Sequence, residues 1–454
     1  MKISHSVSAI ERVWRLFRTI FLKSFHKLTS TNRSKLAREI LRRLNVSSPQ
    51  FPFFQIAKLS LSTGLLSSSE ADQIAHSAVF PDWLIQELKR ICPRGENIKD
   101  QYLQYDDAML LCKPDQFSLK PPAGQFVSGT LTRNFNSKST NLPEMLAYRG
   151  KRAKHFFNFS LNISWAPEGI YGTARNESHR FIINLLEGLE PVHLPDSTLL
   201  CFVRGSSYYT HWLFDTLPKI LGLMKNGIGM DHFDKFVFHD VSKKFHEEIL
   251  DDLGIGLERI ISTKNVGPFI ETNEFTLVSN PRQAYSACSN VYGMIRSFFA
   301  TNPNNQHRSR KIYISRAKAG SRRILNEDEL LEFLDKFGYE RILLEDISIR
   351  HASQIMAEAE AIIAPHGAGL ANIVFAPPGA KVLEIFNAHL TPGYWVAANH
   401  LNLKYYAFEA DAPDGKKCDP EVLANTPAST RGAMDMIVPM KSFRDFLTNE
   451  FNRN

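Results

Sequence analysis

The amino-acid sequence predicts an α/β protein with two Rossmann-like domains that face one another and a helical arm at the N-terminus. From about residue 198, short apolar runs typical of buried strands alternate with segments of helical spacing, which is the pattern of parallel sheets with crossover helices. The chain's 454 residues also exceed the roughly 250–300 that one hydrophobic core supports. Two such domains would hold a ligand between them, at the carboxyl ends of the strands.

The first half of the chain predicts an N-terminal domain over residues 51–300. Residues 51–195 carry short apolar runs among scattered Pro and Gly, and we expect a β-rich or irregular extension there. The Rossmann-like part begins near residue 198, with strands expected at 199–203, 235–239, 259–262 and 275–278 and helices at 211–224, 243–253 and 290–300. The polar stretch 301–310 has the composition of a linker.

The second half predicts a C-terminal domain over residues 301–454. A helix is expected to begin at Asn326, in a capping box closed by Glu329. The other elements expected here are strands at 311–315, 341–344, 361–364, 381–386 and 404–408 and helices at 349–359, 369–375, 394–400 and 441–451.

Composition and charge narrow the class of protein. The chain is 43% hydrophobic and 22% charged, as expected of a folded protein with a core. The net charge of +7 is concentrated at one end, because residues 1–45 carry eleven Lys and Arg against two Glu, which leaves −2 for the rest. A near-neutral body argues against a nucleic-acid partner. The five cysteines form no metal-binding or redox spacing and are expected to be reduced thiols in a cytosol.

Residues 1–50 are expected to form the basic amphipathic helical arm. Apolar residues recur at three- and four-residue steps and would line one helix face: Ile10, Val13, Trp14, Phe17, Phe21, Phe25 and Leu28. No stretch approaches the roughly 20 apolar residues that span a bilayer. Such a helix could lie on an anionic membrane surface. Packing on the protein's own body or on a partner is equally consistent with the pattern.

A glycine-containing turn between an expected strand and an expected helix is the sharpest local signal for a ligand. Residues 364–372 read APHGAGLAN. A turn of this kind lets a phosphate approach backbone N–H groups at a helix N-terminus. Plain turns use glycine as well, and the polar His366 at the strand tip favours a ligand site. We assign five residues of this segment to ligand binding: His366, Gly367, Ala368, Gly369 and Asn372.

Charged residues near the same strand ends add to this assignment. A cationic cluster follows strand 311–315, namely Arg316, Lys318, Arg322 and Arg323. Arg316 and Arg323 are assigned to the phosphate, with Arg316 preferred because it stands at the strand tip. Glu384 lies inside an apolar strand and needs a partner, since an unpaired buried carboxylate is costly. A nucleotide ribose would serve, and so would an arginine such as Arg350.

His211 and Asp215 form the candidate catalytic pair. They stand four residues apart in an expected helix that follows a strand, so the carboxylate can orient the imidazole as in general-base catalysis. Histidine and aspartate at this spacing also occur as an ordinary surface pair. Either residue could be the base, and His211 is slightly preferred because histidine titrates near neutrality.

Three segments together resemble the family 61 glycosyltransferases, which include bacterial capsular polysaccharide biosynthesis proteins. The segments are YYTHWLFDTLPKI (208–220), YISRAKAGSRRILNEDEL (313–330) and APHGAGLANIVFAPPGAKVLEIF (364–386). The resemblance covers roughly residues 195–410 and implies a GT-B-like fold. It also implies an inverting, metal-independent transfer from a nucleotide-sugar donor, with no cofactor.

The resemblance further implies residue roles and partners. Arg316 and the turn from His366 to Gly369 would hold the diphosphate, Glu384 the ribose, and His211 and Asp215 would face the acceptor. The donor would be a UDP-sugar, and the acceptor a glycan or a lipid-linked glycan. A lipid-linked acceptor favours placing the arm at the inner face of the plasma membrane, and the protein in the cytoplasm.

Two other functions share features with this sequence. The turn at residues 366–369 is similar to the oxyanion loop of an α/β-hydrolase, but the G-x-S-x-G elbow that such an enzyme needs is missing from the sequence. The second is a non-catalytic, membrane-associated scaffold that binds a sugar or a nucleotide. The presence of His211, Asp215, Arg316 and Glu384 together argues against it.

Overall fold

A computed structural model describes most of the chain from residue 102 onward. The described residues are 102–103, 108–126, 135, 137–157, 162–166, 169–171, 183, 186, 191–203, 205–283, 285–288, 290–300, 309–426 and 428–452. The expected arm over residues 1–50 and most of the linker 301–310 lie outside them and stay predictions. None of the described helices combines the length and the apolar character that crossing a bilayer requires.

The described residues fall into two compact units, each assembled from separate stretches of sequence. The first contains residues 102–103 and the described parts of Gly150–Asp196 and Ile261–Phe275. The second contains the described parts of Tyr105–Arg149, Ser197–Ile260 and Thr276–Asn454. All the candidate site residues belong to the second unit. The functional division at residue 300 stays a prediction.

The first unit is built largely from antiparallel strands. Strand β6 (Met145–Phe157) pairs with β7 (Asn162–Ala166), β7 pairs with β8 (Gly169–Tyr171), and β1 (Tyr102–Leu103) runs parallel to β8. In its core the rings of Trp165 and Phe269 stack at 5.7 Å. The β-rich character expected for residues 51–195 is therefore observed in this described part. The short helix α10 (Thr263–Val266) also lies in this unit.

The second unit begins its first half with short strands, and parallel strands and helices follow. The short strands are β2 (Met109–Cys112), β3 (Asp115–Ser118), β4 (Ala123–Gln125) and β5 (Ser139–Leu142). Strand β9 (Val192–Leu200) pairs in parallel with β10 (Lys235–Phe238). Strands β11 (Ile260–Ser262) and β12 (Phe269–Val278) lie mostly in the first unit, and β13 (Arg282–Gln283) and β14 (Ser286–Ala287) lie in the second. The helices are α7 (Tyr209–His211), the π-helical segment η2 (Trp212–Thr216), α8 (Leu217–Lys225), α9 (Lys244–Asp252) and α11 (Val291–Phe299), with 3₁₀ turns at Met230–His232 and Leu257–Arg259.

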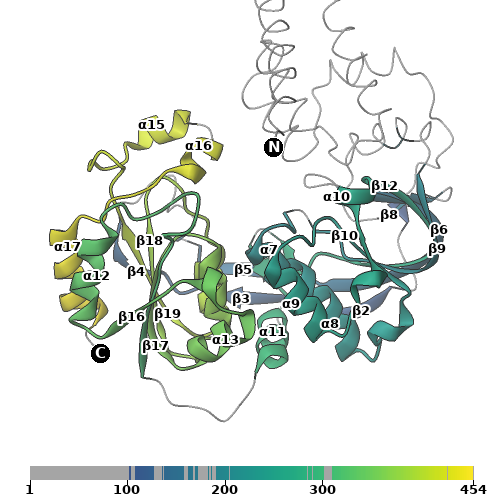
Figure 1. Ribbon diagram of the computed structural model, residues 1–454, viewed down its shortest axis with the longest axis horizontal. Coiled ribbons are helices and arrows are strands. Elements are labelled where there is room, and N and C mark those ends of the chain that lie inside the picture. The colour runs from purple at the N-terminus through teal and green to yellow at the C-terminus, as the bar shows by residue number, and fades with distance from the viewer. Residues whose placement is uncertain are drawn as a thin grey trace, which may run out of the picture. The chain divides into compact units, whose positions relative to one another are not determined.

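The second half of this unit is a parallel sheet with the strand order β16-β15-β17-β18-β19-β4 (Figure 1). Its strands are β15 (Arg310–Ile314), β16 (Tyr339–Ile342), β17 (Ala359–Pro365), β18 (Lys381–Phe386) and β19 (Lys404–Glu409). Its helices are α12 (Glu327–Asp335), α13 (Ile349–Ala357), the 3₁₀ helix η6 (Ala368–Phe375), α14 (Gly393–His400), α15 (Pro420–Asn425), α16 (Ala428–Ala433), α17 (Met440–Phe446) and the π segment η7 (Leu447–Phe451), with a 3₁₀ turn at Leu344–Asp346.

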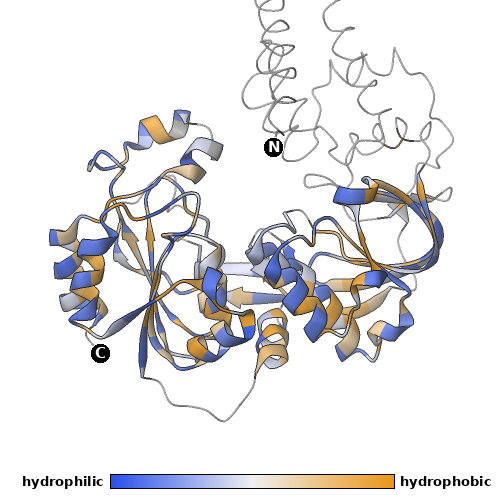
Figure 2. Ribbon diagram, in the orientation of Figure 1, coloured by the Kyte–Doolittle hydropathy of each residue, from blue (hydrophilic) through white to orange (hydrophobic). Residues whose placement is uncertain are grey.

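Both faces of this sheet are buried, as parallel sheets require. Figure 2 shows the hydrophobic residues in its strands. Ile312 and Ile314 pack into one apolar cluster, whereas Tyr313 between them packs into the other. The chain order reverses between β15 and β17, which makes the space beyond their carboxyl ends the expected ligand crevice. The predicted α/β class with parallel sheets is confirmed.

Strand β4 completes this sheet from far upstream in the sequence. Ala123–Gln125 runs parallel to β19, with Gly124 opposite Ala407. Gly124 has a φ of +132°, and a Cβ there would lie 2.0 Å from the Ala407 carbonyl oxygen. A side chain at this position therefore cannot be accommodated. The prediction had no strand here, because three small or polar residues carry no apolar pattern.

Two local predictions were wrong. Glu329 does not close a capping box, because it pairs with Arg444. The side chain of Asn326 instead bonds the backbone of Val438, donating to its carbonyl oxygen and accepting from its N–H. The expected helix 369–375 is a 3₁₀ helix that starts at Ala368.

Candidate active site

The expected helix 211–224 is interrupted where the catalytic pair stands. Helix α7 ends at His211, and the π segment η2 contains Asp215 before α8 continues. Pro218 explains the interruption, because it has no N–H to offer the carbonyl of Phe214 one turn earlier and its ring crowds that carbonyl. Such π segments are frequent at functional sites. His211 Nδ1 lies 2.8 Å from Asp215 Oδ2 within this segment.

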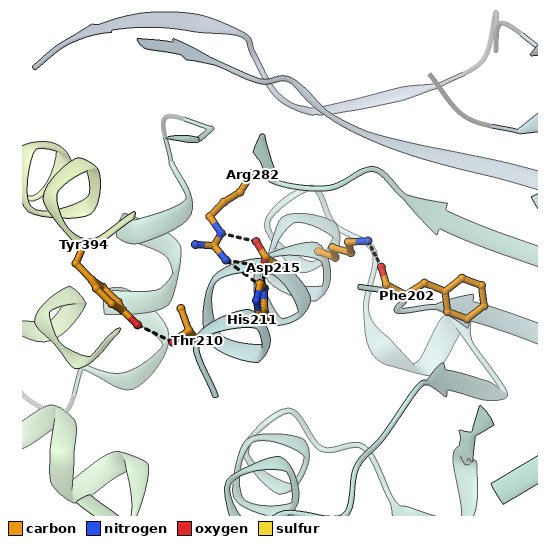
Figure 3. A network of polar contacts seen from close by, with 7 residues as sticks. Phe202, Thr210, His211, Asp215, Arg282 and Tyr394 are labelled. Carbon is orange, nitrogen blue, oxygen red and sulfur yellow. Dashed lines mark hydrogen bonds and ion pairs between the residues drawn. The ribbon is translucent and has the colours of Figure 1, made fainter. Parts of the chain in front are cut away.

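Arg282, from β13, is a third member of the group that His211 and Asp215 form (Figure 3). Its Nε and Nη2 donate to Asp215 Oδ1 at 2.5 Å and Oδ2 at 2.6 Å. Burial by itself raises the pKa of Asp215, but the charge and hydrogen bonds of Arg282, together with those of His211, outweigh it and hold the pKa at about 2. Asp215 is therefore a carboxylate at neutral pH.

An ionised Asp215 decides the tautomer of His211. A carboxylate only accepts hydrogen bonds, so Nδ1 carries the proton that it donates to Asp215. Nε2 then holds a lone pair and can accept a proton. The side chain of His211 is 42% exposed, whereas Asp215 is 9% exposed. Of the two, His211 is the one that an incoming hydroxyl can reach.

The surroundings of the pair fix the imidazole further. A Cβ at Gly205 would lie 2.8 Å from His211 Cδ2, and the φ of Gly205 is +73°, so this glycine allows the chain to pass close to the ring. Lys219 is buried one turn beyond Asp215 and donates to the Phe202 carbonyl at 2.6 Å (Figure 3). Burial lowers the pKa of Lys219 to about 8, against the opposing effects of Cys201 and Asp215.

The structure brings Arg316 and the glycine turn together at the tips of β15 and β17. Arg316 donates to the Ser321 carbonyl from Nη2 at 3.0 Å and from Nε at 3.3 Å. A Cβ at Gly367 would lie only 2.1 Å from Arg316 Nη1. Gly367 therefore allows the guanidinium to lie against the backbone of the turn. Gly369 packs less closely, with Leu344 and Ile314 at 3.1 and 3.2 Å from the position of its missing Cβ.

Glu384 has partners, but they are not the expected ones. One carboxylate oxygen accepts from His366 Nδ1 and the other from the Tyr405 hydroxyl. The Glu384 side chain has no exposed surface. Both oxygens are bonded inside the protein in this structure, and the contact of Glu384 with a ribose stays a prediction. Arg350, the alternative partner, pairs with Asp252 instead.

The loop after β15 carries several cationic side chains. Some of them form ion pairs at the surface, and others lie at the candidate site. Arg323 is exposed and donates to Asp435 at 2.7 and 3.1 Å, and Lys318 pairs with Asp346. Phosphate binding by Arg323 stays a prediction, and in this structure its guanidinium faces a carboxylate. Arg322 is half-buried and donates to the Gly432 carbonyl at 2.7 Å, while its buried Nε has no partner among the described residues. Burial lowers the pKa of Arg322. The half-buried, incompletely bonded Arg322 is therefore a candidate phosphate ligand beside Arg316.

Two hydrogen bonds join α7 to the glycine turn and its neighbours. Tyr209 donates from its hydroxyl to Asn372 Oδ1 at 2.9 Å, and Thr210 Oγ1 lies 2.9 Å from the Tyr394 hydroxyl (Figure 3). Asn372 is buried and also donates to the Gly369 carbonyl, so it braces the turn from within. Because His211 follows these two residues directly, the catalytic pair and the phosphate turn are held in one unit.

Comparison with known proteins covers the same segments. Residues 209–383 match the family Glycosyltransferase 61. The predicted resemblance is confirmed over this segment. It contains the catalytic pair, Arg282, Arg316 and the glycine turn, and ends one residue before Glu384.

Three curated relatives of glycosyltransferase type are similar to parts of the chain. An EGF domain-specific O-linked N-acetylglucosamine transferase of Drosophila melanogaster is 32% identical over 107 residues, 23% of this chain and 20% of that protein. A beta-1,2-xylosyltransferase of Oryza sativa subsp. japonica is 29% identical over 99 residues, 20% of this chain and 21% of that protein. A protein O-linked-mannose beta-1,4-N-acetylglucosaminyltransferase 2 of Bos taurus is 29% identical over 114 residues, 23% of this chain and 20% of that protein. The chain spans about a fifth of the length of these relatives.

Among the described residues, the candidate site residues neither group into a metal site nor line the open hollow that residues 110–115 and Asn290 form. Within the described ranges, no three His, Cys, Asp or Glu residues stand close enough together to hold a metal ion. An open hollow of about 490 Å³ is lined by residues 110–115 and Asn290, and none of the candidate site residues lines it.

Sequence reasoning missed Arg282, Tyr405 and the importance of Arg322. Arg282 and Tyr405 lie far in sequence from the groups that they contact, so no spacing rule links them. Arg322 stood in the predicted cationic cluster, but only the fold distinguishes it from its exposed neighbour.

Proposed function

We propose that the chain is a glycosyltransferase that moves a sugar from a nucleotide-sugar, a UDP-sugar, to a glycan acceptor. The observation that carries this proposal is the placement in one unit of His211, with its Asp215 and Arg282 partners, beside the cationic turn of Arg316 and Gly367. His211 can take a proton, and the turn with Arg316 can hold a diphosphate. The relatives' names include N-acetylglucosaminyl and xylosyl transfer, which favours a hexosyl- or pentosyltransferase.

His211 acts as the general base in this proposal. Its Nε2 takes the proton of the acceptor hydroxyl while the oxygen attacks the anomeric carbon. Asp215 holds Nδ1–H and stabilises the imidazolium that forms, and Arg282 keeps Asp215 ionised. The greater exposure of His211 supports it over Asp215 as the base.

The leaving group departs on the opposite face of the sugar, which inverts the anomeric centre. The bond between the anomeric carbon and the diphosphate oxygen breaks, and its electron pair stays on the diphosphate. Arg316 and Arg322 neutralise that charge, and the N–H groups of the turn at Gly367 add donors. These cations would serve where other transferases use a divalent metal, so we propose that the reaction is metal-independent. A GT-B-like arrangement, with donor and acceptor on facing Rossmann-like halves, fits this division of roles.

A panel of UDP-, GDP- and CMP-sugars, tested for binding, hydrolysis and transfer with EDTA or Mn²⁺ present, examines the proposal. We expect a UDP-sugar to be turned over equally well in EDTA. Activity that disappears in EDTA and returns with Mn²⁺ would disprove the metal-independent mechanism. Binding of a nucleotide-sugar without turnover of any acceptor would instead support the non-catalytic scaffold, which the similarity to known transferases disfavours.

The cellular setting is proposed from the sequence. A role in surface or capsular polysaccharide synthesis fits a glycan or lipid-linked acceptor. The basic residues of the arm at 1–50 favour peripheral attachment to an anionic surface at the inner face of the plasma membrane, in the cytoplasm.

A further inference from the structure

A second histidine–carboxylate pair lies at the end of β17 and within the adjacent strand β18. His366 donates from Nδ1 to Glu384, whose other oxygen accepts from the Tyr405 hydroxyl. The side chains of His366 and Glu384 are 5% and 0% exposed. The proposed transfer chemistry does not use this pair, although the residue after His366 carries the contact with Arg316.

The hydrogen bonds define the tautomer of His366. The Tyr405 hydroxyl donates to one oxygen of Glu384, and the other oxygen is the acceptor for His366. Nδ1 of His366 therefore carries a proton, and in the neutral ring Nε2 carries a lone pair. Within the described residues, Nε2 has no hydrogen-bond partner.

A lone pair on Nε2 would repel a phosphate oxygen, whereas a protonated Nε2 would donate to it. We propose that His366 takes up a proton when the diphosphate of the donor binds, and that Glu384 is the positioning residue that makes this uptake favourable. The inference rests on the proposed function, because it needs a diphosphate at the turn beside His366. The buried carboxylate and the diphosphate then hold the imidazolium from both sides.

The charged and titratable groups around His366 come from three elements and from the loops after β15 and β18. They are Glu384 of β18, Tyr405 of β19, Tyr394 of α14, His389 after β18, and Arg316 and Arg322 after β15. His389 is a poor alternative proton acceptor, since burial, with smaller effects from His366, Arg322 and Arg431, lowers its pKa to about 3.

Calorimetry of UDP binding at pH 8 tests the inference, with GDP and CDP in parallel. Phosphate second ionisations lie near pH 6, so the nucleotide itself is fully ionised at pH 8. Titrations in two buffers that differ in ionisation enthalpy give the number of protons exchanged. We expect uptake of up to about one proton per nucleotide, and weaker binding as the pH rises further. Binding with no uptake, or with proton release, would overturn the inference and leave the proposed function intact.

Two variants connect the uptake to this pair. Glu384→Gln should abolish most of the uptake and weaken UDP binding roughly tenfold, since a neutral amide cannot stabilise an imidazolium. His366→Gln should abolish the uptake as well, and it serves if Glu384→Gln does not fold. His389→Gln is the matched control and should leave the uptake unchanged. Uptake that persists in His366→Gln would place the proton elsewhere, and failure of all three nucleotides to bind the folded wild type would remove the proposed function itself.

Discussion

Replacing Arg282 with Met should reverse the pH dependence that Asp215 contributes to stability. In the native protein Arg282 makes two hydrogen bonds to Asp215, and the two side chains are 11% and 9% exposed. Methionine fills similar space but leaves a buried carboxylate without its cation. Removing one member of a buried ion pair costs about 3–5 kcal/mol.

The direction in which stability changes with pH follows from the pKa of Asp215 in each protein. In the wild type the pKa falls from 3.8 to about 2, which corresponds to about 2.5 kcal/mol of stability that is present above pH 4 and is lost as the pH falls towards 2. In Arg282→Met, burial is no longer outweighed and the pKa of Asp215 rises above its unfolded value. The folded variant then binds the extra proton, so its stability decreases as the pH rises through the raised pKa.

Thermal or urea unfolding between pH 5 and 8 measures this difference. The gap between wild type and Arg282→Met should widen with increasing pH. Arg296→Met is the matched control, because Arg296 is half-buried and donates to the carbonyls of Val374 and Ala376 rather than to a carboxylate. Its destabilisation should not vary with pH. Parallel curves for Arg282→Met and the wild type would refute the assignment of Asp215 as a carboxylate that depends on Arg282.

Three further outcomes are expected. His211→Ala should lower turnover about 10²–10⁴-fold with donor affinity little changed, and Asp215→Asn should be milder; the reverse order in initial-rate kinetics would make Asp215 the base. Arg316→Ala should weaken nucleotide binding by about 1.5–3 kcal/mol in calorimetry, and Gly367→Ala should weaken it too because its Cβ would displace the guanidinium, whereas unchanged affinity in both would place the phosphate elsewhere. Removing residues 1–45 should abolish sedimentation with anionic vesicles but spare activity on short acceptors, and a truncated protein that fails to fold would show that the arm packs on the body.

The sequence predicted the parallel sheet well because its signals are local. Strand 381–386 and the glycine turn at 364–372 can be predicted from apolar runs and from the Gly and Pro residues within a few positions of them. The side-chain partners of the site are not local. Arg282 reaches Asp215 from a separate β-hairpin, and Tyr405 reaches Glu384 from the neighbouring strand. Only the folded chain brings these groups together. The sequence therefore gave no sign that Glu384 is bonded to His366 and Tyr405.

The interruption of the catalytic helix is a different kind of miss. Pro218 is visible in the sequence and marks a break in helical hydrogen bonding. The apolar spacing continued across it, so an unbroken helix over 211–224 was predicted. The structure accommodates the proline with a π segment and keeps the apolar face buried.

Strand β4 limits which fragments and chimeras of this protein can fold. A fragment that starts at residue 301 would lack Ala123–Gln125 and leave the edge of β19 with unpaired backbone groups, which invites pairing with other chains. Exchanging the C-terminal half with that of a relative would also have to transplant Gly124, whose close approach to Ala407 tolerates no side chain. The division of the sequence near residue 300 therefore does not coincide with a division of the folded structure. We expect soluble chimeras only when Ala123–Gln125 is transferred together with the C-terminal sheet.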